Sequence, residues 1–445
     1  MNRQPNTAMR VAGAVVGNAF EWYDFTIYAY MTPIISSLFF PVDPHDPATQ
    51  INAVLATTAV FGVGFFMRPV GGVVLGVIGD KYGRRTGMVL GMTLMALATL
   101  IMTVAPTYRQ VGLLAPAIIV VSRLLQGFSL GGQFGTSTSF LIEMAPPGKS
   151  GIYGSWQMTG QIASLAVGTA FGVVLTLLYT PAELAAGLWR IPFGFGVVIL
   201  PITWYIRRNL EESQVFVAMQ RERVAGAAAG IGIGLVGHTR QLLVSIGMIA
   251  ASAVSFYAVY GYTVTYAKTV LHLPVEDAFV AELVAACLML VVVPVGGMLC
   301  DRFSGARKPM LVGFLAVYFL LMYPAYAWLV ADPTTTKLVI VELAVSLISG
   351  LFLGVYCTTM SELFPPRIRS TGLSIANNVA VLIFGGFAQF FLTLIYQLTG
   401  SQIAPVYYVM FGIAVGLLGA LFMPVRAGGA RASAAFDAGR SATRT

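Results

Sequence analysis

The chain has 445 residues, of which 57% are hydrophobic and only 10% are charged, and its formal net charge is +8 at pH 7. About a quarter of the residues of a soluble domain are charged, so this composition excludes a soluble globule and predicts an integral protein of the lipid bilayer. Basic residues are retained on the side of a membrane that is not translocated, so the positive charge does not indicate a nucleic-acid partner and we expect none.

Apolar runs of about the 20 residues that a helix needs to cross the hydrocarbon core recur along the chain. They predict an all-α membrane protein with twelve transmembrane helices. The predicted spans are residues 11–38, 52–78, 86–105, 112–142, 151–179, 188–207, 241–267, 276–300, 309–330, 338–360, 370–397 and 404–425. Placing the N-terminus in the cytoplasm puts most of the 26 basic residues on the cytoplasmic side, and the even number of spans then places both termini there.

Four ionisable residues stand out inside the spans of the first half. A rise of about 1.5 Å per residue places Asp24, Arg68 and Arg123 roughly halfway through the hydrocarbon. Glu21 precedes Asp24 by about one turn, on the cytoplasmic side. An ionisable residue at such a depth is costly to bury and is a functional-site hypothesis by default.

The chemistry of these four residues suggests which of them bind substrate and which carry protons. The planar fork of arginine suits carboxylate ligands, so we expect Arg123, and secondarily Arg68, to bind an anionic substrate. Asp24 and Glu21 can exchange protons and would carry the coupling proton. Two alternatives remain open: a permanent structural ion pair between Arg68 and Asp24, and a role for Arg68 in bracing the kink at Pro69.

A loop pattern occurs once in each half of the chain. The first copy begins Gly76-x-x-x-Asp80 and the second begins Gly297-x-x-x-Asp301. A further pair begins with Glu143 and with Glu362, each followed closely by two prolines. The predicted topology puts all four loops in the cytoplasm, so the halves are parallel copies of a six-span unit. This duplication is typical of transporters whose halves rock around a site at the bilayer midplane.

We expect these loops to gate the cytoplasmic side. In the state closed to the cytoplasm, the Asp80 carboxylate would cap a neighbouring helix and pair with an arginine, and these contacts would break when the halves tilt. The alternative is that Arg84 and Arg85 only anchor the topology. The residues assigned to the gate are Asp80, Arg84, Arg85, Glu143, Asp301, Arg302 and Glu362.

Uncharged polar side chains would complete a central pocket. The fourth and fifth spans carry glutamines, and the seventh, tenth and eleventh carry tyrosines and asparagines, all of which can hydrogen-bond substrate oxygens. We expect no charge at comparable depth in the second half, so that only neutral groups contribute there. The assigned residues are Gln126, Gln157, Gln161, Tyr257, Tyr260, Tyr356, Asn377 and Asn378.

The chain divides into an N-terminal bundle at 1–207, a cytoplasmic linker at 208–240, a C-terminal bundle at 241–425 and a disordered cytoplasmic tail at 426–445. The three cysteines and three histidines show no metal-ligand spacing, and no nucleophile–base pair is present. We therefore expect no metal site, no cofactor other than the proton as coupling ion, and no enzyme activity. We also expect a monomer.

Several motifs resemble those of known transporters. The Gly76–Arg85 loop is similar to the loop motif of the major facilitator superfamily, and nearly the whole chain resembles the metabolite:proton symporter family. The matching stretches are Gly17-Asn18-Ala19-Phe20-Glu21-Trp22-Tyr23-Asp24-Phe25, Phe66-Met67-Arg68-Pro69-Val70-Gly71-Gly72, Ser122-Arg123-Leu124-Leu125-Gln126-Gly127-Phe128-Ser129, Trp189-Arg190-Ile191-Pro192-Phe193 and Ser361-Glu362-Leu363-Phe364-Pro365. Within this family, Ser155-Trp156-Gln157 and residues 262–271 resemble the citrate and tricarballylate branch.

Two positions depart from the family pattern. Gln133 stands where many members have a glutamate, which leaves coupling to Glu21 and Asp24, and Asn377-Asn378 replaces a usual Tyr-Asn, which bears on substrate identity.

The resemblance implies a proton-coupled symporter of the bacterial inner membrane that imports a small organic anion by alternating access. We expect a di- or tricarboxylate of the citrate type. A zwitterionic osmolyte such as proline or betaine is the main alternative, and an aromatic acid is another. An aromatic cage favours a quaternary ammonium, so competition between citrate and betaine for uptake would separate the first alternative from the expected substrate. A sensor that binds a ligand without transporting it is a further alternative.

Overall fold

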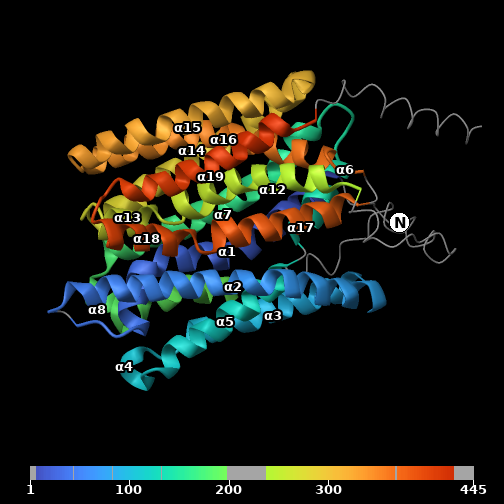
Figure 1. Ribbon diagram of the computed structural model, residues 1–445. Coiled ribbons are helices and arrows are strands. Elements are labelled where there is room, and N and C mark those ends of the chain that lie inside the picture. The colour runs from blue at the N-terminus through green and yellow to red at the C-terminus, as the bar shows by residue number, and fades with distance from the viewer. Residues whose placement is uncertain are drawn as a thin grey trace, which may run out of the picture.

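The computed structural model describes residues 7–43, 45–82, 84–131, 133–197, 237–365 and 368–424, and within these ranges all regular elements are helices (Figure 1). The first half contains α1 (Thr7–Phe39), α2 (Pro47–Tyr82), α3 (Arg84–Val104), α4 (Tyr108–Val111), α5 (Leu114–Leu130), α6 (Gln133–Glu143), α7 (Ser150–Leu178), α8 (Pro181–Glu183), the π-helical turn η1 (Leu184–Leu188) and a helix at 190–197. The second half contains α12 (Thr239–Ala253), η2 (Val254–Tyr260), α13 (Thr263–Thr269), α14 (Val275–Arg302), η3 (Ser304–Ala306), α15 (Arg307–Ala331), α16 (Thr335–Glu362), α17 (Arg369–Val381), η4 (Leu382–Gly386), α18 (Ala388–Thr399) and α19 (Ala404–Phe422).

Most of the predicted spans coincide with these helices. Eight helical segments of the described part are long and apolar enough to cross a membrane, and α5 and the Leu90–Val104 part of α3 are shorter apolar helices. Three predicted spans are interrupted: 112–142 breaks at Gly131 between α5 and α6, and 241–267 and 370–397 each contain a π-helical segment. Most of the predicted linker at 208–240 and the tail at 426–445 lie outside the described residues.

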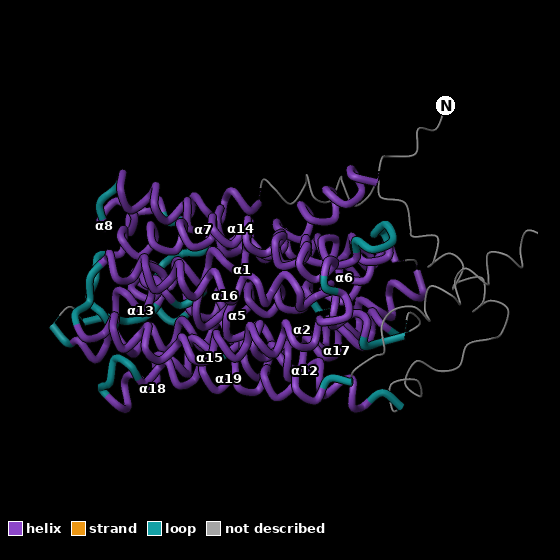
Figure 2. Tube along the Cα trace, turned by 90° about the horizontal axis from the view of Figure 1, so that it is seen from above, coloured by secondary structure: helices purple, strands orange, loops and turns teal. Residues whose placement is uncertain are grey.

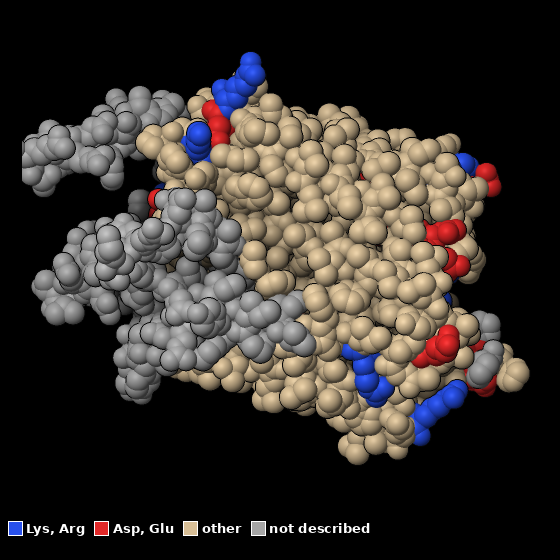
Figure 3. Space-filling model, turned by 180° about the vertical axis from the view of Figure 1, so that it is seen from behind, with Lys and Arg blue, Asp and Glu red and all other residues tan. Residues whose placement is uncertain are grey.

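The surface has the pattern that lipid requires. Large apolar side chains such as Val73, Leu177 and Leu320 are exposed on the flanks of the bundle, and such a surface would be an aggregation hazard in water. On the face seen in Figure 3, the Lys, Arg, Asp and Glu side chains lie mainly towards the two ends, and uncharged residues form the band between them. The helices run along the same direction in both ribbon and tube views (Figures 1 and 2).

Glycines bring α2 and α5 into close contact. A methyl group placed on Gly127 would lie 1.7 Å from the backbone oxygen of Gly64, and one on Gly71 would lie 1.8 Å from the backbone oxygen of Phe128. Only residues without a side chain fit at this separation, which is how small residues let membrane helices pack. The contact sets Arg68 of α2 and Arg123 of α5 side by side in the bundle.

The two halves meet along α7 and α14. Near the predicted outer end, a methyl group on Gly172 would lie 2.2 Å from the Phe279 ring, and near the predicted cytoplasmic end one on Gly297 would lie 2.7 Å from Ser155. A second seam is formed by α2 and η4, where Phe65 lies against Gly386. The halves are therefore in contact towards both membrane faces, which closes the centre of the molecule.

Candidate functional site

Arg68 is buried among aromatic rings at the middle of α2. Its guanidinium carbon lies 4.1 Å from the ring centre of Phe65, 4.7 Å from that of Phe25 and 5.6 Å from that of Trp22. The faces of these rings attract a cation, which offsets part of the cost of burying it. The Nε and Nη2 atoms of Arg68 have no hydrogen-bond partner, so the guanidinium keeps donors available to a ligand.

Arg123 is held in the same way on α5. It is fully buried, and its guanidinium carbon lies 3.8 Å from the Tyr28 ring centre and 5.7 Å from that of Phe25. Its Nε, Nη1 and Nη2 atoms are all without hydrogen-bond partners. The Phe25 ring is thus close to two guanidinium groups, each of which has hydrogen-bond donors without a partner. Such an arrangement is costly in an interior and suits an incoming anion.

Asp24 lies on α1 next to this pair. It is 1% exposed, and its Oδ2 atom is 2.5 Å from the hydroxyl of Thr99 on α3. Its Oδ1 atom has no hydrogen-bond partner, and a methyl group on Gly196 would lie 2.4 Å from that oxygen. Arg123 is close enough to act on this carboxyl electrostatically, yet in the described part of the chain no ion pair joins Asp24 to Arg68 or Arg123. The structure therefore does not show the permanent Arg68–Asp24 ion pair that the sequence left open.

The predicted glutamines are all buried in the N-terminal bundle. Neither amide atom of Gln126 has a hydrogen-bond partner, and the same holds for Nε2 of Gln161. Gln157 donates from Nε2 to Asn18 at 3.3 Å, and its Oε1 atom is without a partner. The three glutamines therefore hold donors and acceptors without partners inside the N-terminal bundle.

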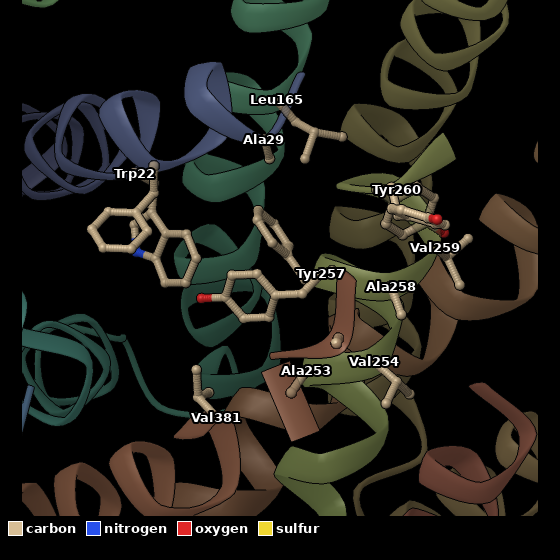
Figure 4. Close-up of a cluster of buried hydrophobic side chains, with 14 of the residues drawn as sticks. Trp22, Ala29, Leu165, Ala253, Val254, Tyr257, Ala258, Val259, Tyr260 and Val381 are labelled. Atoms are coloured by element: carbon tan, nitrogen blue, oxygen red, sulfur yellow. The ribbon is translucent and has the colours of Figure 1, made fainter. Parts of the chain in front are cut away.

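Tyr257 brings the C-terminal half to this cluster. Its ring lies 5.2 Å from that of Phe65 and 6.0 Å from that of Trp22, and its hydroxyl is within the electrostatic reach of Arg68. Figure 4 shows Tyr257 extending towards Trp22 while Tyr260 is directed away from it. A small cavity lined by residues that include Phe25, Phe61 and Tyr257 lies here, with room for about one water molecule.

The other predicted residues of the second half have different surroundings. The hydroxyl of Tyr260 pairs with Ser349 on α16, inside the C-terminal bundle. Tyr356 is buried near Tyr257. Asn377 is buried, and Asn378 donates from Nδ2 to the backbone oxygen of Gly131 at 2.7 Å, where it joins the halves at the break between α5 and α6.

The second half holds two buried ionisable residues nearer the outer helix ends, which the sequence analysis did not single out. Glu282 on α14 and Glu342 on α16 are 0% and 1% exposed. Both lie inside predicted spans, 276–300 and 338–360, so the signal was present in the sequence. We expected charge to matter near the midplane, but burial depends on the neighbouring helices and not only on the distance to a helix end.

The second copy of the loop pattern forms a contact between the halves at the predicted cytoplasmic end. The Asp301 carboxylate accepts hydrogen bonds from the backbone nitrogens of Gly151 at 2.6 Å and Ile152 at 2.9 Å, so it caps the first turn of α7. Arg307 forms an ion pair with Glu362 and donates to the Ser150 hydroxyl at 3.3 Å.

The remaining gate residues are less informative. Arg302 is exposed and lies over the Phe303 ring at 5.7 Å, and Glu143 is exposed. The side chains of Asp80, Arg84 and Arg85, like that of Glu21, are outside the described part of the structure, so their roles stay predictions.

Comparison with known proteins identifies the family. Residues 11–232 match the family described as Sugar (and other) transporter. The citrate-proton symporter of Klebsiella pneumoniae is 33% identical over 92% of this chain and 89% of its own length. The proline/betaine transporter of Escherichia coli K12 is 32% identical, over 92% of this chain and 81% of its own length. A solved D-xylose-proton symporter has a TM-score of 0.71 with 17% identity, over 93% of this chain and 96% of its own.

The chain belongs to the major facilitator superfamily. It is a member of the metabolite:proton symporter family, as its motifs predicted, and it is a multi-pass, proton-coupled membrane symporter. The similarity to the xylose symporter shows the shared fold alone. One of the two relatives is named for citrate and the other for proline and betaine, so the substrate of this symporter has to be argued from its own residues.

The match to the transporter family, residues 11–232, includes the part of this symporter that holds Asp24, Arg68 and Arg123. The buried glutamates of α14 and α16 lie outside that match. Asp24, Arg68 and Arg123 are thus buried in the first half of the symporter, and Glu282 and Glu342 are buried in the second.

Proposed function

We propose that this symporter imports a small organic anion with two or three carboxylates, of the citrate type, together with protons across the bacterial inner membrane. The observation that carries the proposal is the pair Arg68 and Arg123, whose guanidinium groups both lie close to the Phe25 ring and have hydrogen-bond donors without a partner. A guanidinium binds a carboxylate through two parallel hydrogen bonds, so two of them suit a substrate with more than one carboxylate. Gln126, Gln157 and Gln161 would bind the remaining oxygens.

The same geometry argues against a zwitterionic osmolyte. A quaternary ammonium would need free aromatic faces, but those of Trp22, Phe25 and Phe65 already surround Arg68. A betaine or proline would place its positive charge beside that of the protein. An aromatic acid has one carboxylate and would leave one guanidinium without an anionic partner.

Asp24 is the proposed proton carrier, with Glu21 as the second. The Thr99 hydroxyl lies 2.5 Å from Asp24 and 3.0 Å from the backbone oxygen of Met95. A hydroxyl has one hydrogen to donate, so both contacts are satisfied when Thr99 donates to Met95 and a protonated Asp24 donates to Thr99. Deprotonated Asp24 would instead provide an internal anion for Arg123, in competition with the substrate.

Coupling follows from this competition and from the membrane potential. Each negative charge that enters a cell against a negative interior costs about 2.3 kcal/mol per 100 mV, and co-transported protons offset that cost. Substrate cannot enter the closed cavity, so the halves must separate on one side at a time. We propose that Asp301, Arg302, Glu143 and Glu362 hold the cytoplasmic side, with Asp80, Arg84 and Arg85 as their counterparts in the first half.

Uptake by purified protein in liposomes tests the proposal. Radiolabelled citrate should accumulate when the outside is acidic, and excess tricarballylate or succinate should compete while betaine, proline and benzoate should not. The protein should work as a monomer and without added metal or cofactor. Accumulation of proline or betaine, with no competition by citrate, would refute the assignment.

A further inference from the structure

Two buried glutamates lie apart from the central site, in the predicted outer half of the C-terminal bundle. Glu282 and Glu342 each follow the start of their helix by about two turns. They are near enough to interact electrostatically, and Thr263 of α13 lies beside both. Neither residue takes part in the arrangement of Asp24, Arg68 and Arg123.

The surroundings of this glutamate pair contain no balancing positive charge. The titratable groups that face it are phenols: Tyr30 on α1, Tyr260 on η2, and Tyr318 and Tyr326 on α15. No Lys, Arg or His of the described ranges forms an ion pair with either carboxyl. Lys268, the cation on α13, donates instead to the backbone oxygen of Pro33 at 3.4 Å.

Buried polar atoms of the pair lack partners. The Oε2 atoms of both glutamates have none. Tyr318 is fully buried within the electrostatic reach of Glu342. Two adjacent, uncompensated carboxylates in such an interior would be very unfavourable. A bound proton removes one charge and supplies a donor.

The hydrogen bonds around Glu342 agree with a bound proton. The Thr263 hydroxyl lies 2.6 Å from the backbone oxygen of Val259 and 3.0 Å from Oε1 of Glu342. Because it can donate only one hydrogen, both contacts are satisfied when Thr263 donates to Val259 and a protonated Glu342 donates to Thr263.

The pair also connects the halves. Tyr30 of the N-terminal bundle donates to Oε1 of Glu282 at 3.1 Å. Near the outer ends, Gln397 of α18 donates to Asn52 of α2 at 3.2 Å, so the outer sides of the halves are together in this state. When the outer side opens, the link between Tyr30 and Glu282 has to break and water can reach the carboxyls.

We propose that Glu282 and Glu342 form a second proton-binding site, whose protonation from outside favours closure of the outer side. The proton is bound when the pair is buried against Tyr30 and released when the outer side opens to water. This site is distinct from Asp24, and its action does not depend on which substrate the symporter carries.

Infrared difference spectroscopy of the substrate-free protein tests proton binding directly. Between acidic and alkaline pH, the wild-type protein should show a carboxyl C=O band that is lost in Glu282→Gln with Glu342→Gln and retained in Asp24→Asn. The proposal is overturned if no such band depends on the two glutamates while the protein remains folded.

The link to closure is tested by measuring distances between spin labels on the outer ends of α2 and α18, with Cys287, which is exposed, replaced by serine. The wild-type distance should lengthen as the pH rises, and the double Gln variant, with a permanently uncharged pair, should stay short at every pH. Asp24→Asn should respond as the wild type does, and Tyr30→Phe should open at lower pH. A pH response that persists in the double Gln variant would contradict the proposal.

Discussion

Arg123 is the residue that we expect to contribute most to binding of the substrate carboxylates. Its guanidinium lies on the Tyr28 ring and keeps all its nitrogen donors free of protein partners. Arg123→Lys retains the charge but removes the planar fork and the stacking contact. We expect a loss of about 1.5–3 kcal/mol in substrate binding, which is a Kd weaker by roughly ten- to a hundred-fold.

Isothermal titration with citrate measures this change. Arg109→Lys is the matched control, because Arg109 is exposed on α4 and lies away from the cluster. Equal affinity in the wild type and in Arg123→Lys would show that the guanidinium is not a ligand.

Asp24 is expected to link proton movement to substrate movement. Asp24→Asn keeps the shape and the contact with Thr99 but cannot release a proton. It should therefore lose concentrative uptake and keep exchange of internal for external substrate. Flux assays in liposomes with and without a pH gradient separate the two, with Asp43→Asn in an exposed outer loop as the control. Gradient-driven accumulation by Asp24→Asn would remove Asp24 from the coupling mechanism.

At the scale of the helices, the contact between α2 and α5 positions both arginines. Gly127→Ala would place a methyl group 1.7 Å from the Gly64 oxygen, so the helices must move apart, at a cost of about 1–3 kcal/mol. We expect a lower melting temperature and weaker substrate binding. Gly313→Ala on α15 is the control, since a methyl group there meets no atom within 4 Å. Equal melting temperatures for the two variants would show that the close contact is dispensable.

The sequence predicted the helices better than their interruptions. Hydrophobic length located α14 and α15 to within a few residues, because lipid imposes a strict length on a span. The π-helical segments η2 and η4 could not be foreseen, because they depend on packing against other helices. Tyr257 and Tyr260 both lie within η2, and Tyr257 extends towards Trp22 while Tyr260 is directed away from it.

The central site could be predicted in part. The ionisable residues of the first half were recognisable because apolar sequence surrounds them. Their aromatic partners were not, since Phe65 and Phe25 are ordinary apolar residues until the helices bring them to Arg68. Glu282 and Glu342 were visible as charges in spans, but their proximity comes only from the packing of α14 on α16.

At the scale of the whole molecule, the contact of Asp301 with α7 holds the halves together at one face. Asp301→Asn keeps the size of the side chain but removes the charge that favours the N-terminus of a helix. A loss of about 1 kcal/mol would raise the population open to the cytoplasm by roughly five-fold. The distance between spin labels at the cytoplasmic ends of α7 and α14 reports this population.

Asp277→Asn is the control for that experiment, because Asp277 lies at the other end of α14 and accepts a hydrogen bond from Thr335 at 2.6 Å. An unchanged distance distribution in Asp301→Asn would show that the cap does not contribute to closure.

The small size of the cavity beside Phe25 and Tyr257 has a consequence for ion leakage. A chamber with room for about one water molecule cannot hold a hydrated sodium or potassium ion. An empty carrier that reorients through this state therefore carries no such ion with it. Membranes containing the protein should therefore show no added sodium or potassium conductance when substrate is absent. The ion gradients of the cell are then preserved until substrate is available.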